Sequence, residues 1–174
     1  MSTSSRALTF FKGATILLAT ASASGNLMIS TFVTPRLLDA PTDVMLKQWR
    51  NTFESGMRVF RTAFIATSVG YFGLAYALSG GLRGRMLVAG GALSLAVVPY
   101  TYIFMMPTNR ELLAMAAQRV DGQATKEDTD KSHDNVQATE DRARRLVDDW
   151  GVLNLGRAAL SWSSAILGMT AILI

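Results

Sequence analysis

The sequence predicts an all-α fold: a four-transmembrane-helix antiparallel bundle with one long polar loop between the third and fourth helices. Of the 174 residues, 49% are hydrophobic and 17% are charged, a smaller charged share than a soluble domain usually carries. Residues 13–34, 62–82 and 86–109 contain no Asp, Glu, Lys or Arg, and residues 150–174 contain only Arg157. Each stretch reaches the roughly 20 residues that cross a bilayer core as a helix. We therefore expect one membrane domain over residues 1–174, embedded in a lipid bilayer.

The first span is expected at about residues 13–34 and is rich in alanine, serine and glycine. Small residues let membrane helices approach one another closely. A small-residue motif at residues 21–23 resembles a signal-peptide cleavage site, but the apolar run continues beyond it, so we predict an uncleaved helix. Asn26 lies within this span and should face another helix or a cavity, because an unpaired amide is costly in hydrocarbon. Pro35 is expected to end the helix.

The second and third spans are expected at about residues 60–82 and 86–107. The glycine-rich turn between them is short, so these helices should be antiparallel neighbours. Pro99 should kink the third span, because proline removes a backbone hydrogen bond inside a helix.

The connection between the third and fourth spans is predicted as a polar loop at about residues 111–140. Its central part, residues 121–138, has too few apolar side chains to pack, so most of it should be dispensable for folding. The only histidine, His133, lies in this segment, and the chain has no cysteine. We therefore expect no metal site. The net charge of +4 comes from basic residues that flank apolar spans, as membrane anchors do, and we expect no nucleic-acid partner.

The fourth span, at about residues 150–174, carries a polar stripe. Trp150, Asn154, Arg157, Ser161 and Ser164 follow one another at intervals of three or four residues, which places them on one face of a helix. A polar face on a membrane helix should point inward, towards a partner or a cavity. The alternative is an arginine that merely extends to the membrane interface.

Two blocks of sequence resemble a family of small membrane proteins that includes the fungal anthrone oxygenases. They are Pro107-Thr108-Asn109-x-x-Leu112 at the end of the third span and Trp150-x-x-Leu153-Asn154-x-x-Arg157 in the fourth. Ser24-Gly25, Pro35, Gln48-Trp49 and Gly56 also fit the family's pattern. The resemblance implies an oxygenase that converts a polyketide anthrone to an anthraquinone. Dioxygen would be the co-substrate and no cofactor would be bound, in an intracellular membrane such as the endoplasmic reticulum.

The resemblance also suggests roles for individual residues. Arg157 would stabilise a substrate phenolate, with Asn154 and Asn109 donating hydrogen bonds. Trp150, with Trp49 as a partner, would stack on the aromatic substrate, and Thr108 and Asn26 would complete its binding site. The base stays open among Glu54, Asp148, Asp149, Tyr100 and Tyr102.

Two other functions compete with an oxygenase that binds an aromatic polyketide. The first is a non-catalytic membrane scaffold or accessory subunit, in which the polar stripe would contact another subunit. The second is a transporter, although the sequence lacks the internal repeat that such proteins often have. A homo-oligomer is compatible with each of these functions.

Overall fold

The computed structural model describes residues 3–78, 80–122 and 133–174, and within these ranges it contains helices and no strand. The elements, in chain order, are α1 (Thr3–Met28), the π-helical segment η1 (Ile29–Val33), α2 (Thr34–Leu38), α3 (Thr42–Ala77), α4 (Gly81–Tyr100), a second π-helical segment η2 (Thr101–Met105), α5 (Met106–Gly122) and α6 (His133–Leu173). The predicted all-α class is confirmed.

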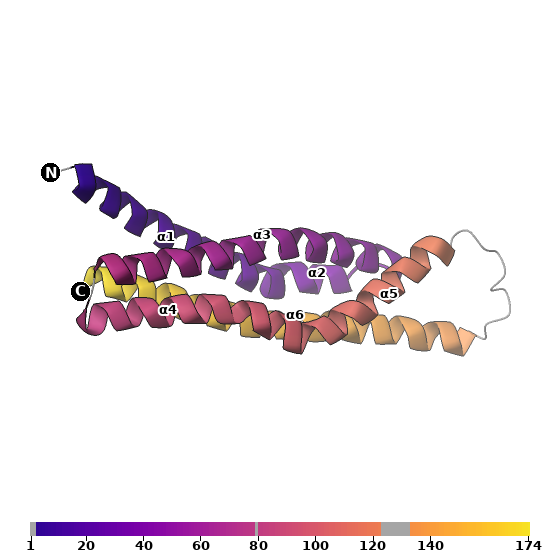
Figure 1. Cartoon of the computed structure of the whole chain (residues 1–174). Helices are drawn as coiled ribbons and strands as arrows, with labels where there is room; N and C mark the ends of the chain where they lie inside the picture. The colour runs from indigo at the N-terminus through magenta and orange to yellow at the C-terminus, as the bar shows by residue number, and fades with distance from the viewer. Residues whose placement is uncertain (1–2, 79, 123–132) are drawn as a thin grey trace.

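The elements form four long helical segments, here called rods, whose chain direction alternates along the bundle (Figure 1). The first rod is α1–η1–α2 and the third is α4–η2–α5, while α3 and α6 are the second and fourth. The beginning of α1 and the end of α6 lie at one end of the bundle, and the end of α5 and the beginning of α6 lie at the other. Between α3 and α4, Gly80 and Gly81 have φ angles of +108° and +66°, which favour glycine. This tight reversal makes α3 and α4 antiparallel neighbours, as predicted.

Two of the four rods are long and apolar enough to cross a membrane. These segments are Ser5–Leu38 and Gly81–Arg119, and they contain the first and third predicted spans. Large hydrophobic side chains such as Phe10, Leu17 and Ile103 are exposed on their surfaces, where lipid would cover them. That these rods cross a membrane, and that residues 60–82 and 150–174 do so too, stays a prediction from their apolar character and scarcity of charge.

Pro35 and Pro99 do not end the rods in which they lie, and the prediction that Pro35 would end its helix is wrong. The first rod changes to π-helix over Ile29–Val33, and Pro35 then lies in the first turn of α2, where no backbone N–H is needed. The side-chain hydroxyl of Thr34 donates to the carbonyl of Ile29 at 3.0 Å. Pro107 likewise lies in the first turn of α5, directly after η2, whereas Pro99 lies inside α4. A π-helical segment thus precedes both Pro35 and Pro107, and each rod continues through its proline; that Pro99 kinks the third span stays a prediction.

The polar connection is shorter than predicted. Of the expected loop at residues 111–140, residues 111–122 belong to α5 and residues 133–140 belong to α6, while residues 123–132 lie outside the described ranges. Ion pairs join these ends of α5 and α6 to each other and to α3. Arg119 lies 2.6 Å from Asp43 and 3.5 Å from Glu140, and Arg142 lies 2.6 Å from Glu111. The charged composition hid two amphipathic helix ends that face each other.

Near the α3–α4 turn, the helices pack at backbone distance. Two serine hydroxyls join α3 and α4. Ser68 of α3 donates to the carbonyl of Gly91 at 2.9 Å, and Ser94 of α4 donates to the carbonyl of Phe64 at 3.0 Å. Ser164 of α6 donates to the carbonyl of Gly90 at 2.7 Å. A Cβ atom at Gly90 would lie 3.2 Å from the carbonyl oxygen of Ser164. Small residues therefore determine the separation of these three helices.

We expect Gly90→Leu to destabilise the bundle by about 1–3 kcal/mol, because the new side chain would overpack the contact between α4 and α6. Thermal unfolding of the purified protein in detergent measures the effect. Gly13→Leu is the matched control, since a Cβ atom there meets nothing within 4 Å. Equal stability of the two variants would contradict this account of the packing.

Candidate functional site

A cluster of large side chains fills the bundle at the end that carries the α5–α6 connection. We call it the tryptophan cluster. Its buried members are Leu37, Met45, Leu46, Trp49, Met105, Leu112, Ala116, Ala143, Val147 and Trp150. The ring centroids of Trp49 and Trp150 lie 6.0 Å apart at an interplanar angle of 80°, and Phe53 stacks on Trp49 at 5.3 Å. The structure therefore brings together the two tryptophans that sequence analysis proposed as partners.

Asn109 and Asn154 are fully buried beside this cluster. Asn109 lies between Met105 and Leu112 at helical spacing, so it shares the face of its rod that packs into the cluster. Asn154 follows Trp150 by one turn of α6. Neither amide has a hydrogen-bond partner for its nitrogen or its oxygen among the described residues. These two side chains therefore carry unused hydrogen-bonding capacity inside the protein.

Further buried polar atoms lack a partner in the same way. The indole nitrogens of Trp49 and Trp150 are buried and have no partner in the described ranges. Asn26 of α1 is fully buried, and its nitrogen donates to the carbonyl of Ser22 at 2.9 Å while its oxygen has no partner there. Leaving a buried polar group unpaired costs about 1–3 kcal/mol. A set of this kind indicates a place for a polar ligand.

Arg157 is half-buried three residues beyond Asn154 on α6. Its guanidinium carbon lies 5.9 Å from the ring centroid of Phe64, within the range of a cation–π contact. Arg157 also lines a small cavity of about 20 Å³ together with Thr101, Tyr102 and Phe64. Its Nε atom is buried and has no hydrogen-bond partner in the described part of the chain. This cation therefore retains a free donor inside the bundle.

That Arg157, Asn154 and Asn109 act together on one substrate stays a prediction. Neither asparagine lines the small cavity beside Arg157. Trp150 is only 2% exposed and packs against Trp49. Thr108, next to Asn109, is half-buried.

The structure separates the candidate bases. Asp148 and Asp149 are exposed, and Glu54 is exposed and forms an ion pair with Arg50 at 2.8 Å. Tyr100 donates its hydroxyl to the carbonyl of Leu153 at 3.0 Å. Tyr102 is the one of the five candidates that lines the cavity beside Arg157.

Sequence reasoning missed Gly156 and Arg144, which position the site. The ring of Tyr100 packs directly on Gly156, where a Cβ atom would collide with the hydroxyl. Arg144 of α6 donates to the carbonyls of Leu38 and Ala40, at 2.5 and 3.1 Å, and so holds the end of α2 against α6. The motif Leu153-Asn154-x-Gly156 could have suggested close packing at Gly156, but nothing in the sequence marks Arg144 among its charged neighbours.

We expect Asn109→Leu and Asn154→Leu to keep or raise the melting temperature. Each removes a buried amide that has no described partner, and an apolar group of similar shape is neutral or stabilising in such a place. Differential scanning fluorimetry of the purified variants measures this, with exposed Asn51→Leu as the control for an equal change in composition. A loss of about 1 kcal/mol or more, roughly 2–4 °C for a chain of this size, would show that the amides serve the fold.

Comparison with known proteins relates this site to a family. The family described as anthrone oxygenase matches residues 49–167. The chain is 32% identical over 146 residues to the anthrone oxygenase of Claviceps purpurea, and the aligned region covers 83% of this chain and 78% of that protein. It is 28% identical over 185 residues to the anthrone oxygenase of Emericella nidulans, covering 93% and 96% of the two chains. It is also 28% identical over 150 residues to the monooxygenase hypC of Dothistroma septosporum, covering 84% and 74%.

No solved structure matches the chain. The region that the family comparison matches includes both clustered tryptophans, Asn109, Asn154 and Arg157. The match also extends over more than half of the sequence. By these similarities, the chain belongs to the anthrone oxygenase family of oxygenase enzymes.

Proposed function

We propose that this protein is a membrane oxygenase that converts a polyketide anthrone to an anthraquinone with dioxygen and without a bound cofactor. The observation that carries the proposal is the set of buried amide and indole groups around the tryptophan cluster that have no described partner. An anthrone presents a flat aromatic surface together with carbonyl and phenol oxygens. Such a molecule supplies both the apolar contact and the hydrogen-bond partners that this set calls for.

The proposed reaction begins at the central methylene group of the anthrone. Loss of one proton from this carbon gives an electron-rich phenolate-type anion. The anion transfers an electron to dioxygen, and recombination at the same carbon followed by protonation gives a hydroperoxide. Loss of water from the hydroperoxide leaves the second carbonyl group. In total, one anthrone and one dioxygen give one anthraquinone and one water.

The side chains suit this chemistry in distinct ways. Asn109 and Asn154 would donate hydrogen bonds to the substrate's oxygens, and Arg157 would stabilise the anion as a fixed cation in a site of low dielectric constant. Trp49 and Trp150 would contact the ring system, with Thr108 and Asn26 near it. Tyr102 is the base that we favour, because it lines the cavity beside Arg157. The same enclosure would keep reduced oxygen species away from water.

The proposal includes the surroundings of the enzyme. All four rods would cross an intracellular membrane such as the endoplasmic reticulum, and an apolar polyketide would reach the protein from the bilayer. The support is the two apolar rods and the scarcity of charge in the other two spans. A homo-oligomer is compatible with this arrangement.

Membranes that contain the protein should oxidise emodin anthrone faster than membranes from a vector control. In ¹⁸O₂, mass spectrometry should find one labelled oxygen in each emodin molecule, because the new carbonyl oxygen comes from dioxygen. The vector control measures autoxidation. A folded protein that adds nothing to the control rate would leave the non-catalytic accessory function as the better account.

Arg157→Leu should lower the oxidation rate about 10²–10³-fold, because it removes the cation and its hydrogen-bond donors from the site. Arg157→Lys should recover part of the rate, since a point charge replaces a planar guanidinium. Arg110→Leu is the matched control: it makes the same change at an exposed position next to Asn109. A folded Arg157→Leu protein that works at the wild-type rate would remove Arg157 from the mechanism.

A further inference from the structure

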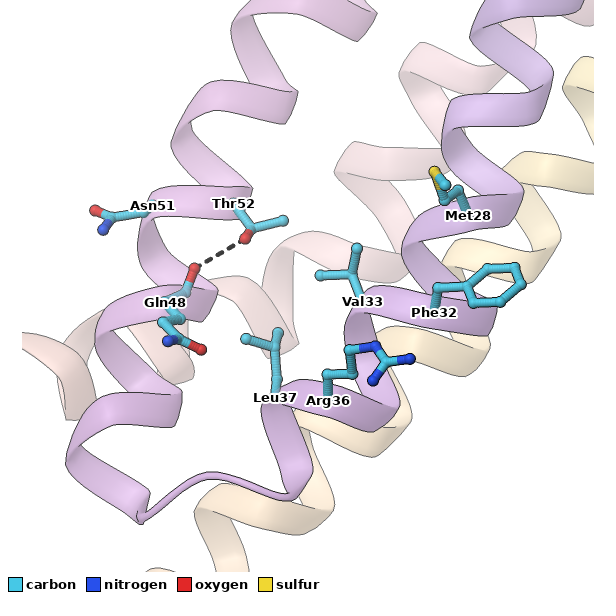
Figure 2. A pocket seen from close by; sticks show the side chains of 8 residues that line it. All are labelled: Met28, Phe32, Val33, Arg36, Leu37, Gln48, Asn51 and Thr52. Atoms are coloured by element: carbon cyan, nitrogen blue, oxygen red, sulfur yellow. Dashed lines mark hydrogen bonds between the residues drawn. The ribbon is translucent and has the colours of Figure 1, made fainter.

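A groove of about 450 Å³ separates the first rod from the beginning of α3. Figure 2 shows its two walls. Met28, Phe32, Val33 and Leu37 form an apolar wall with Arg36 beside them, and Gln48, Asn51 and Thr52 of α3 form a polar wall. The volume lies within the range of small-molecule sites, which is roughly 300–1,000 Å³.

We infer that this groove is an outer site, separate from the buried groups around the tryptophan cluster, which binds the substrate as a flat phenolic aromatic molecule with an ionised hydroxyl group, held between the apolar wall and the amides and close to Arg36. The choice of this occupant rests on the proposed function. The assignment adds Arg36, Gln48 and Asn51 to the residues that recognise the substrate.

The polar groups of the groove are available to a ligand. Arg36, Gln48 and Asn51 are exposed, and their side chains have no hydrogen bond or ion pair to other described residues. Only the hydroxyl of Thr52 is used, donating to the carbonyl of Gln48 at 2.9 Å (Figure 2). The described lining contains one cation and no carboxylate. The groove therefore favours a ligand with a single negative charge and a few oxygen atoms.

The groove adjoins the tryptophan cluster. Its apolar wall includes Leu37, a buried member of the cluster, and Val33, which packs against it. Gln48 and Thr52 are close along α3 to Trp49 and Phe53, whose rings stack inside the cluster. The groove and the tryptophan cluster thus share Leu37 as a common wall.

The π-helical segment η1 builds part of this wall. Phe32 and Val33 both belong to η1, and π-helical turns occur frequently at functional sites. A phospholipid is the competing occupant of a groove on a membrane protein. The lining favours the aromatic molecule, because a phosphate group gains most from several cations, whereas this groove offers one cation and two amides.

Equilibrium dialysis of emodin against the purified full-length protein in phosphatidylcholine nanodiscs tests the inference. Wild-type protein should bind emodin saturably, after subtraction of empty discs. Arg36→Gln should weaken binding about 10-fold and Arg36→Lys about threefold, because a charge-assisted hydrogen bond is lost or replaced by a weaker one. Asn51→Trp should abolish binding by filling the groove.

The matched control is Arg85→Gln, which removes an exposed arginine from a different groove, beside the α3–α4 turn; it should bind emodin like the wild type. Emodin binding within twofold of wild type in both Arg36→Gln and Asn51→Trp would overturn the inference. Binding of phosphatidic acid in nanodiscs that is weakened by Arg36→Gln, combined with that result, would assign the groove to lipid.

Because dialysis needs no turnover, the two proposals fail separately. Arg36-dependent binding by a protein that does not oxidise anthrones would refute the proposed function and keep the groove. Oxidation with an unchanged KM for emodin anthrone in Arg36→Gln, together with unchanged binding, would refute the groove and keep the function.

Discussion

Polar groups buried inside a helical bundle need partners, and in this bundle some have one among the described residues while others do not. Near the α3–α4 turn, the hydroxyls of Ser68, Ser94 and Ser164 donate to carbonyls of neighbouring helices. These bonds let α4 lie against α3 and α6 at backbone distance. At the opposite end, Asn109 and Asn154 are equally buried but have no partner among the described residues. The hydroxyl of Tyr71 and the indole nitrogen of Trp162 have no partner among the described residues either, so the serine hydroxyls join the helices while unused hydrogen-bonding capacity remains along the bundle.

The two π-helical segments explain how long rods can carry this cluster. In an α-helix each residue turns the chain by about 100°, and one additional residue in a π-helical turn rotates everything beyond it by a similar angle. Segment η1 precedes Leu37, and η2 contains Met105 and precedes Leu112. All three side chains pack into the tryptophan cluster. The cluster therefore depends on a change of helical register in two different rods.

Much of this arrangement follows from the sequence, and the remainder has identifiable physical reasons. Charge-poor stretches predicted the all-α class, the short glycine-rich turn predicted the antiparallel α3–α4 pair, and the motifs around Asn109 and Asn154 predicted the family. The continuation of the first rod past Pro35 was not predictable from constant 3.6-residue periodicity, because η1 breaks that period. The helical ends of the polar connection were hidden because Arg119 and Arg142 are paired with acids from distant sequence positions. The pairing of Trp49 with Trp150 was suggested by family resemblance, but its edge-to-face geometry depends on three-dimensional packing.

The hydrogen bonds of Arg144 have a consequence for biosynthesis. The carbonyl of Leu38 at the end of the first rod accepts from a guanidinium that lies 106 positions later in the chain. A ribosome synthesises the first rod long before α6 exists, so this carbonyl must first be satisfied by another donor, such as water. The order of synthesis therefore makes the arrival of α6 the step that closes this end of the bundle, and the wall of the groove formed by α2 takes its final position only then.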